Sequence, residues 1–234
     1  KLVTLANQFL LDKKVTFLNH GSFGACPIKI FNEYQSWQKK LENQPVKFLD
    51  QYRDFGPNMT NVRKILSKKI NCNLNNLAPV VNATTGLNAI IKSIQFNKGD
   101  EVLISNHEYG ALEKTWQFIK TKYKIKINVV KVTLPLISED QFINDFTKKF
   151  NNKTKILFLS HITSPTALLF PIKKLISLAR QKKIITIIDG AHVPGHIDLN
   201  LNTLNADFYS GNCHKWMMSP KGAAFMWSSS KYKN

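Results

Sequence analysis

The chain has 234 residues, of which 43% are hydrophobic, 11% aromatic and 21% charged, a composition that is typical of a globular protein and excludes a fibre or a disordered tail. Its 33 Lys and Arg residues outnumber its 15 Asp and Glu residues, and the formal net charge of +18 raises the question of nucleic acid or an anionic membrane as a partner.

The basic residues are scattered along the chain and do not form a run with interleaved aromatic residues. Lysine, asparagine and isoleucine all have AT-rich codons, so a biased genome accounts for the charge. We therefore expect no nucleic-acid partner, and a non-enzymatic basic binding module is kept as the alternative of another class. No apolar run reaches the roughly 18–20 residues of a membrane span, so no membrane association is expected either.

The sequence contains three cysteines: Cys26, Cys72 and Cys213. An odd number without a CxxC spacing argues against a disulfide framework and a zinc knuckle, and it favours a reducing, cytoplasmic location. His192 and His196 have the helical spacing of a zinc pair, but Pro194 and Gly195 lie between them and oppose a helix. No metal site is predicted.

Two amphipathic helices are predicted in the first third of the chain. Within residues 28–41, apolar side chains recur at Ile30, Tyr34, Trp37 and Leu41, and Pro27 suits a helix start. A second helical pattern covers residues 59–70. The aromatic residues of the first helix are expected to pack in the core.

From residue 77 onward, apolar runs rich in β-branched residues alternate with helical patterns. The predicted strands are 77–81, 101–105, 125–132, 155–160, 184–189, 207–210 and 223–227, and the predicted helices are 85–95, 111–123, 139–150 and 172–182. Strands that are apolar at nearly every position are buried on both faces, and their alternation with helices makes βαβ units of a mostly parallel sheet. We therefore expect an α/β domain with its ligand site beyond the carboxyl ends of the strands.

Polar residues cluster directly after five of these strands. The segments are 82–86, 106–110, 161–166, 189–192 and 210–215. One such cluster alone is explained by helix caps and turns, but five at successive strand ends indicate a site. The first segment places an Ala-Thr-Thr-Gly sequence ahead of a helix, where N–H groups and hydroxyls suit a phosphate.

Two charged residues in these segments point to one cofactor. Asp189 ends a very apolar strand, where a buried carboxylate needs a cation or several donors. Lys215 stands between His214 and Trp216, surroundings in which a lysine amine can become a nucleophile toward carbonyls. A phosphate cradle, a strand-end carboxylate and a lysine together specify pyridoxal 5′-phosphate. The sequence has no P-loop and no GxGxxG, HExxH or GxSxG motif.

Six segments resemble the class V aminotransferase family. They are FLNHGSFGACP (17–27), NATTGLNAI (82–90), NHEYGALE (106–113), SHITSPTALLFPI (160–172), DGAHVPG (189–195) and SGNCHKWMMSPKGAAF (210–225). The resemblance covers essentially the whole chain, and the branch that looks closest contains isopenicillin N epimerase-like proteins. It implies the large domain of a fold-type I pyridoxal-phosphate enzyme, a mixed and mainly parallel sheet of about seven strands with helices on both faces.

The resemblance also implies roles for individual residues. Lys215 is the lysine that forms a Schiff base with the cofactor, Asp189 pairs with the pyridine nitrogen, and His192 lies near the phenolic oxygen. The phosphate would be held by Thr84, Thr85 and His214.

The ring-stacking residue falls within 106–110, where Tyr109 is favoured over His107. Ser164 stands where desulfurases carry an Asn near the phenolic oxygen, and Asn212 stands where they often carry Ser. The substrate entrance would be lined by Asn19 and His20.

For the domain organisation, we expect residues 1–26 to contribute to the active-site entrance and residues 27–234 to form the cofactor-binding large domain. The chain begins without Met and ends just after the strand at 223–227, whereas family members continue into a small C-terminal domain, so we expect an incomplete enzyme. The expected function is epimerisation, racemisation or aminotransfer at the α-carbon of an amino acid. A cysteine desulfurase or selenocysteine lyase is the alternative, and a homodimer is expected at full length.

Overall fold

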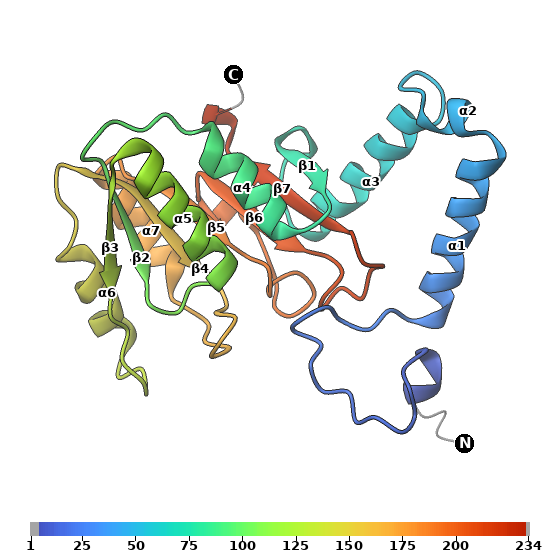
Figure 1. Ribbon diagram of the computed structural model, residues 1–234, viewed down its shortest axis with the longest axis horizontal. Helices are drawn as coiled ribbons and strands as arrows, with labels where there is room; N and C mark the ends of the chain where they lie inside the picture. The colour runs from blue at the N-terminus through green and yellow to red at the C-terminus, as the bar shows by residue number, and fades with distance from the viewer. Residues whose placement is uncertain (1–4, 233–234) are drawn as a thin grey trace.

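Seven strands form one sheet at the centre of the computed structural model, which describes residues 5–232 (Figure 1). They are β1 (Leu77–Val80), β2 (Glu101–Ser105), β3 (Lys126–Val130), β4 (Thr154–Ser160), β5 (Ile185–Asp189), β6 (Phe208–Asn212) and β7 (Ala224–Ser228). Their order across the sheet is β1-β7-β6-β5-β4-β2-β3. All pairs from β3 to β6 are parallel, and only β7 runs antiparallel to its neighbours β1 and β6. The predicted mixed, mainly parallel sheet is confirmed.

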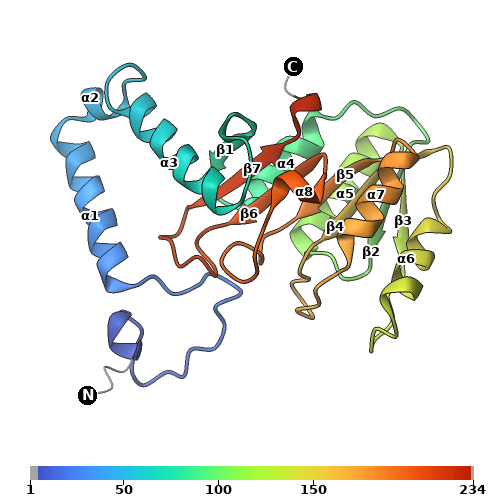
Figure 2. The ribbon, with the colours of Figure 1, turned by 180° about the vertical axis from the view of Figure 1, so that it is seen from behind.

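Helices cover both faces of this sheet. The helices α4 (Ala83–Ser93) and α5 (Gly110–Tyr123) lie in front of it in Figure 1, and α7 (Ile172–Gln181) and α8 (Leu201–Leu204) lie in front in Figure 2, which shows the opposite side. Successive residues of β4 divide between two buried cores: Ile156 and Phe158 pack with α4 and α5, and Leu157 and Leu159 pack with α7, α8 and α6 (Glu139–Thr147). This alternation follows from the pleat, and it explains why both faces of the strand are apolar.

The register of the parallel strands brings their polar ends to one edge. Ser160 at the end of β4 is paired with Asp189 at the end of β5, and Asp189 is paired with Ser210 in β6. The hydrogen-bonded ladder between β2 and β4 stops earlier, at Leu103 and Leu157. The chain order also reverses between β2 and β4, so this is the switch point at which α/β sheets bind ligands.

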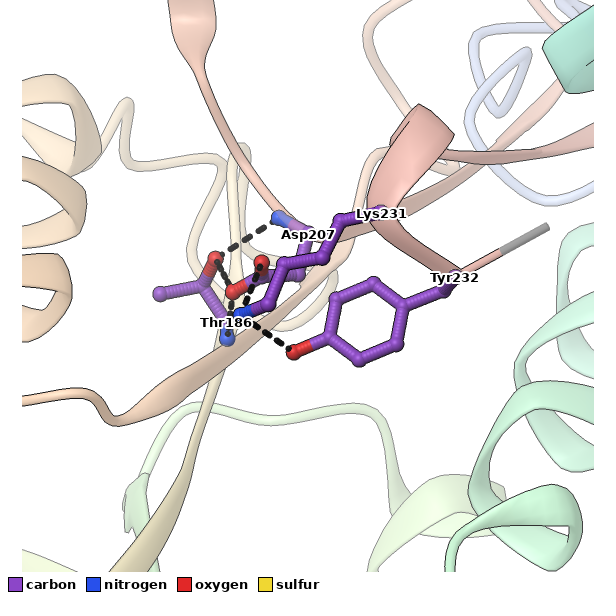
Figure 3. A network of polar contacts seen from close by, with 4 residues as sticks. All are labelled: Thr186, Asp207, Lys231 and Tyr232. Atoms are coloured by element: carbon purple, nitrogen blue, oxygen red, sulfur yellow. Dashed lines mark hydrogen bonds and ion pairs between the residues drawn. The ribbon is translucent and has the colours of Figure 1, made fainter. Parts of the chain in front are cut away.

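At the other end of the parallel strands, just before β6 begins, a buried carboxylate joins three segments (Figure 3). Asp207 Oδ2 accepts hydrogen bonds from the backbone N and the Oγ1 of Thr186, at 2.8 and 3.0 Å. The Nζ of Lys231, in the short 3-10 helix η3 (Ser230–Tyr232), lies 4.0 Å from Asp207 Oδ1 and 3.1 Å from the hydroxyl of Tyr232. Asp207 is thus a buried aspartate that has one hydroxyl donor, one amide donor and a cation nearby.

The N-terminal helices form an arm at one side of the sheet (Figures 1 and 2). The arm consists of α1 (Ile28–Asn43), α2 (Pro45–Leu49) and α3 (Phe55–Lys69), and two further 3-10 helices are η1 (Leu5–Gln8) and η2 (Leu74–Asn76). The helix α1 is found where it was predicted, but it buries none of its residues. Tyr34 is 39% exposed and Trp37 is 37% exposed, with Trp37 packed edge-on against Phe48 of α2 at 6.0 Å.

The expectation that these aromatic residues pack in the core was therefore wrong. A helical period shows that a helix has an apolar face, but it does not show what covers that face. Within residues 5–232, we find no helix with the length and hydrophobicity needed to cross a membrane.

Candidate active site

A cleft of about 770 Å³ lies at the edge of the sheet where the parallel strands end. Ten predicted site residues line it: Asn19, Thr84, Thr85, Tyr109, Ser164, Asp189, His192, Asn212, His214 and Lys215. Two predicted residues, His20 and His107, are not part of its lining. Segments that are far apart in the sequence therefore build one site.

The floor of the cleft contains a buried carboxylate with few partners. Asp189 is 4% exposed, and its Oδ1 accepts a hydrogen bond from the backbone N of Ala191 at 2.9 Å. Burial raises the pKa of Asp189 to about 6, and the Ala191 N–H and the charge of Lys215 oppose this rise only in part. Asp207 has a lysine amine 4.0 Å away, whereas Asp189 forms no ion pair within the described residues. A protonated ring nitrogen would supply the positive charge that Asp189 needs.

Lys215 and His192 face each other in the cleft. The Nζ of Lys215 lies 3.1 Å from the Nε2 of His192, and both residues are half-buried. Burial lowers the pKa of Lys215, and burial together with the charges of Lys215 and His196 lowers the pKa of His192 to about 4. Near neutral pH, His192 is therefore an uncharged imidazole whose Nε2 can accept a hydrogen bond from the amine of Lys215.

The N-terminus of α4 forms the polar end of the cleft. The side chain of Asn82 accepts a hydrogen bond from the backbone N of Thr85 at 2.7 Å, and the side chain of Asn212 accepts one from the backbone N of Ala83 at 2.8 Å. In the part of the chain that the structure describes, the N–H of Thr84 between them has no hydrogen-bond partner. This free N–H, two threonine hydroxyls and the helix dipole suit a phosphate.

Two basic side chains also line the cleft. The Nδ1–H of His214 donates to the carbonyl of Ala223 at 3.0 Å, which leaves Nε2 available, and burial lowers the pKa of this imidazole. Lys221 also lines the cleft, and its Nζ donates to the carbonyl of Gly24 at 2.7 Å. The sequence analysis did not identify Lys221, because a single lysine in a basic chain gives no signal.

A close approach between α4 and β6 fixes this end of the site against the strand that leads to Lys215. A Cβ placed on Gly86 would lie 2.6 Å from the Oγ of Ser210 and 3.1 Å from the Cβ of Met226. Only glycine allows this contact, which explains the glycine in the Ala-Thr-Thr-Gly sequence.

The structure separates the two candidates for the ring-stacking position. Tyr109 lines the cleft and is 45% exposed. His107 is buried, and its ring is held between the Oγ1 of Thr166 at 3.1 Å and the carbonyl of Val132 at 3.0 Å, packed edge-on against Phe170. His107 therefore fastens three loops together and does not reach the cleft.

The N-terminal segment contributes Asn19, Gly21, Ser22 and Phe23 to the cleft. The Oδ1 of Asn19 accepts from the backbone N and the hydroxyl of Ser22, at 3.1 and 3.0 Å, so this side chain stabilises a turn. His20 does not line the cleft as expected, because it packs edge-on against Phe17, with ring centroids 4.7 Å apart.

Glu108 and Ser160 are the other residues that the sequence analysis missed. Ser160 lines the cleft, and Glu108 is buried behind it with its carboxylate bonded to Ser160. A glutamate so close to the end of an apolar strand is the signal by which Glu108 could have been found. Of the described residues, no arginine and no cysteine lines the cleft.

Taken together, these donors fit pyridoxal 5′-phosphate. The helix N-terminus offers an unpaired N–H for the phosphate, Asp189 offers a buried carboxylate for a protonated ring nitrogen, and Lys215 presents an amine in the same cleft.

Comparisons with known proteins agree with this assignment. The family model described as aminotransferase class-V matches residues 27–234. Isopenicillin N epimerase of Amycolatopsis lactamdurans is 31% identical over 94% of this chain and 55% of its own length. Hercynylcysteine sulfoxide lyase of Schizosaccharomyces pombe is 27% identical over 98% of this chain and 58% of its own length. A probable chloroplastic L-cysteine desulfhydrase of Arabidopsis thaliana is 28% identical, with 92% and 48% covered.

Solved structures show the same fold. A lysine-to-alanine mutant of C-DES, with glycine covalently linked to its PLP cofactor, superposes with a TM-score of 0.86 at 20% identity over 96% of this chain and 59% of that chain. The apo cysteine desulfurase of Thermococcus onnurineus gives a TM-score of 0.79 at 18% identity, with 97% and 56% covered. The chain thus spans little more than half the length of these proteins.

Proposed function

The chain belongs to the aminotransferase class-V family, and we propose that it forms the cofactor-binding part of an enzyme that acts at the α-carbon of an amino acid. The cofactor of this family is pyridoxal 5′-phosphate. One observation carries the proposal: the amine of Lys215, its pKa lowered by burial, lies 3.1 Å from His192 in a cleft that also contains the cation-deficient Asp189.

We assign the binding roles as follows. The phosphate is held by the Thr84 N–H and by the side chains of Thr84, Thr85 and His214. Tyr109 covers one side of the ring, and the carboxylate of Asp189 holds the ring nitrogen in its protonated form. Asn212 acts indirectly, because its Oδ1 is occupied by the N–H of Ala83.

The remaining residues act on protons and on substrate. Pyridoxal phosphate, when bound, supplies an electron sink for charge at the α-carbon. The amine of Lys215 removes and returns the α-proton, because burial favours its neutral form. His192 orients that amine through the contact at its Nε2, and Ser164, an exposed residue of the cleft lining, offers a further polar contact.

Among the reactions that begin with loss of the α-proton, we favour epimerisation or racemisation over aminotransfer. The support is the 31% identity with isopenicillin N epimerase over 94% of this chain. Carbon–sulfur bond cleavage is the second candidate, supported by the desulfhydrase and sulfoxide lyase relatives. Family membership speaks against a non-enzymatic basic binding module.

The organisation of the protein completes the proposal. Residues 27–234 form the large domain, and residues 1–26, of which the first four lie outside the described residues, contribute to the entrance through the segment at 19–23. We further propose a cytoplasmic homodimer.

Product analysis in deuterated water tests the function. The protein at its full natural length, loaded with pyridoxal phosphate, is incubated with a panel of L-amino acids that includes cysteine. We expect deuterium at the α-carbon and formation of the D-enantiomer, whereas release of pyruvate and sulfide from cysteine would instead establish the lyase. Loss of the exchange in Lys215→Ala is the control, and exchange that persists in this variant would contradict the role of Lys215.

A further inference from the structure

We propose that Glu108 is a positioning residue of this site, whose buried carboxylate ties the loop carrying Tyr109 to the end of β4 beside Asp189. The inference rests on the proposed function for its cofactor, but the geometry that supports it belongs to the chain alone.

The carboxylate of Glu108 is the acceptor for two strand ends. Its Oε1 accepts from the hydroxyl of Ser105 at 2.5 Å and from the backbone N of the same residue at 3.4 Å. Its Oε2 accepts from the backbone N of Ser160 at 2.8 Å and from its hydroxyl at 2.7 Å. With 5% of its surface exposed, Glu108 makes these bonds away from water, where they are strong.

These bonds lie where the sheet itself provides none. The ladder between β2 and β4 stops at Leu103 and Leu157, so the ends of the two strands separate beyond that point. Glu108 spans this separation with one side chain. It therefore fixes the distance between the ends of β2 and β4, on either side of the switch point at which the cleft lies.

The position of Glu108 couples it to two cofactor contacts. Tyr109 is the next residue, and the N-terminus of α5 follows at Gly110. Ser160 is paired with Asp189 across the ladder between β4 and β5, and the negative charge of Asp189 raises the pKa of Glu108. A change in the carboxylate is thus expected to displace both the residue that covers the ring and the end of β4 beside Asp189.

A carboxylate suits this position better than an amide. Burial raises the pKa of Glu108 to about 7, while the hydrogen bonds from Ser105 and Ser160 oppose the rise and the Asp189 charge adds to it. A glutamine retains one acceptor oxygen and brings an NH2 group to the other side. Whichever way the amide is turned, its NH2 group faces the hydroxyl and the backbone N–H of one serine, Ser105 or Ser160. The hydroxyl can rotate to accept, but the backbone N–H cannot, so two donors face each other in either orientation.

Glu108→Gln is the test, with Glu113→Gln as the matched control. Glu113 is exposed in the first turn of α5, which begins two residues after Glu108, so its variant makes the same change of side chain without affecting the hydrogen bonds to Ser105 and Ser160. Amide hydrogen exchange in the apo chain is expected to rise at least tenfold in peptides covering 105–111 and 160–163 of Glu108→Gln, and to stay unchanged in β5. The dissociation constant for pyridoxal phosphate, from absorbance titration, is expected to rise at least tenfold, and the pH at which the bound chromophore changes its absorbance is expected to shift.

The outcomes test separately the hydrogen bonds of Glu108 to Ser105 and Ser160, called the bridge, and the proposed function. Exchange that rises equally in β5 would show a general loss of stability and overturn the positioning role, as would wild-type exchange with wild-type affinity. Faster local exchange with an unchanged chromophore would also overturn it. A wild-type chain that binds no pyridoxal phosphate would overturn the proposed function, whereas the exchange measurement would still test the bridge.

Discussion

Two buried aspartates show how the environment of one residue marks a binding site. Asp207 is 7% exposed and has hydroxyl and amide donors from Thr186 and a cation 4.0 Å away. Asp189 is 4% exposed and accepts one hydrogen bond, from Ala191. A buried charge is costly unless it is compensated. Asp189 is therefore suited to bind a cationic group of a ligand, whereas Asp207 has a structural role.

The chemistry of Lys215 gives a first prediction. Borohydride reduction of the chain in the presence of pyridoxal phosphate, followed by peptide mapping, should place the pyridoxyl mass on Lys215. Lys221 lines the same cleft and serves as an internal control, since its amine is bound to the carbonyl of Gly24. A label on Lys221, or bound cofactor without any label, would refute the assignment.

The pKa of Asp189 gives a second prediction, on stability. Its pKa rises from 3.8 to about 6 on folding, so the native state binds the proton more tightly than the unfolded state, and apo stability falls as pH increases through this range. Asp189→Asn removes the charge and should stabilise the apo chain above pH 6 by about 1–3 kcal/mol, at roughly 1.4 kcal/mol per pKa unit. The same variant should bind the cofactor more weakly and nearly abolish α-proton exchange.

Denaturant unfolding of both proteins at pH 4 and pH 8 measures this effect. The difference in the free energy of unfolding between Asp189→Asn and wild type should be small at pH 4 and large at pH 8. Asp198→Asn, which changes an exposed aspartate, should show no such difference. A variant that is destabilised at pH 8, or that exchanges the α-proton as fast as wild type, would contradict the role.

At the scale of elements, the contact between the N-terminal segment and the loop of Lys215 rests on one glycine. Gly24 has a φ of +70°, and a Cβ at this position would lie 2.4 Å from the carbonyl oxygen of His214. Gly99 has a φ of +89° with open space around it, so alanine there meets the backbone strain without the collision.

We therefore predict that Gly24→Ala lowers the free energy of unfolding and the cofactor affinity more than Gly99→Ala does. The strain common to both positions costs about 1 kcal/mol, and the collision adds to it only in Gly24→Ala. Thermal unfolding and absorbance titration of both variants provide the comparison. Equal losses in the two variants would show that the segment does not press against the loop.

The sequence predicted most elements and the residues at the strand ends, because apolar runs and polar strand ends are local patterns. It favoured Tyr109 over His107 but could not show that His107 is buried, since that depends on Thr166 and Val132, which are distant in the sequence. It missed α2 and α8, which are too short to show a period. It placed the start of α4 at residue 85, whereas Asn82 is the N-cap and the helix begins at residue 83.

At the scale of the whole molecule, the arm made of α1, α2 and α3 leaves apolar side chains in solvent. Ile30 is 43% exposed and Ile65 is 62% exposed, in addition to the aromatic residues of α1. Apolar faces of this kind are common where protein surfaces associate. We predict that the proposed homodimer uses this arm.

Sedimentation over a range of concentrations tests the prediction. Trp37→Glu should weaken self-association at least tenfold, because a charge would have to be buried in the interface. Lys39→Glu changes an exposed charge on the same helix and should have a smaller effect. A wild-type chain that stays monomeric, or a dimer that tolerates Trp37→Glu, would exclude the arm.

The strand order also imposes a sequence of events on biosynthesis. In the described residues, the only strand that pairs with β1 is β7, although these are the first and the last strands of the sheet. At about 5–20 residues per second, a ribosome that has released β1 needs several more seconds before it releases β7. During that interval β1 has no strand partner, and it is therefore the strand of the nascent chain most in need of a chaperone.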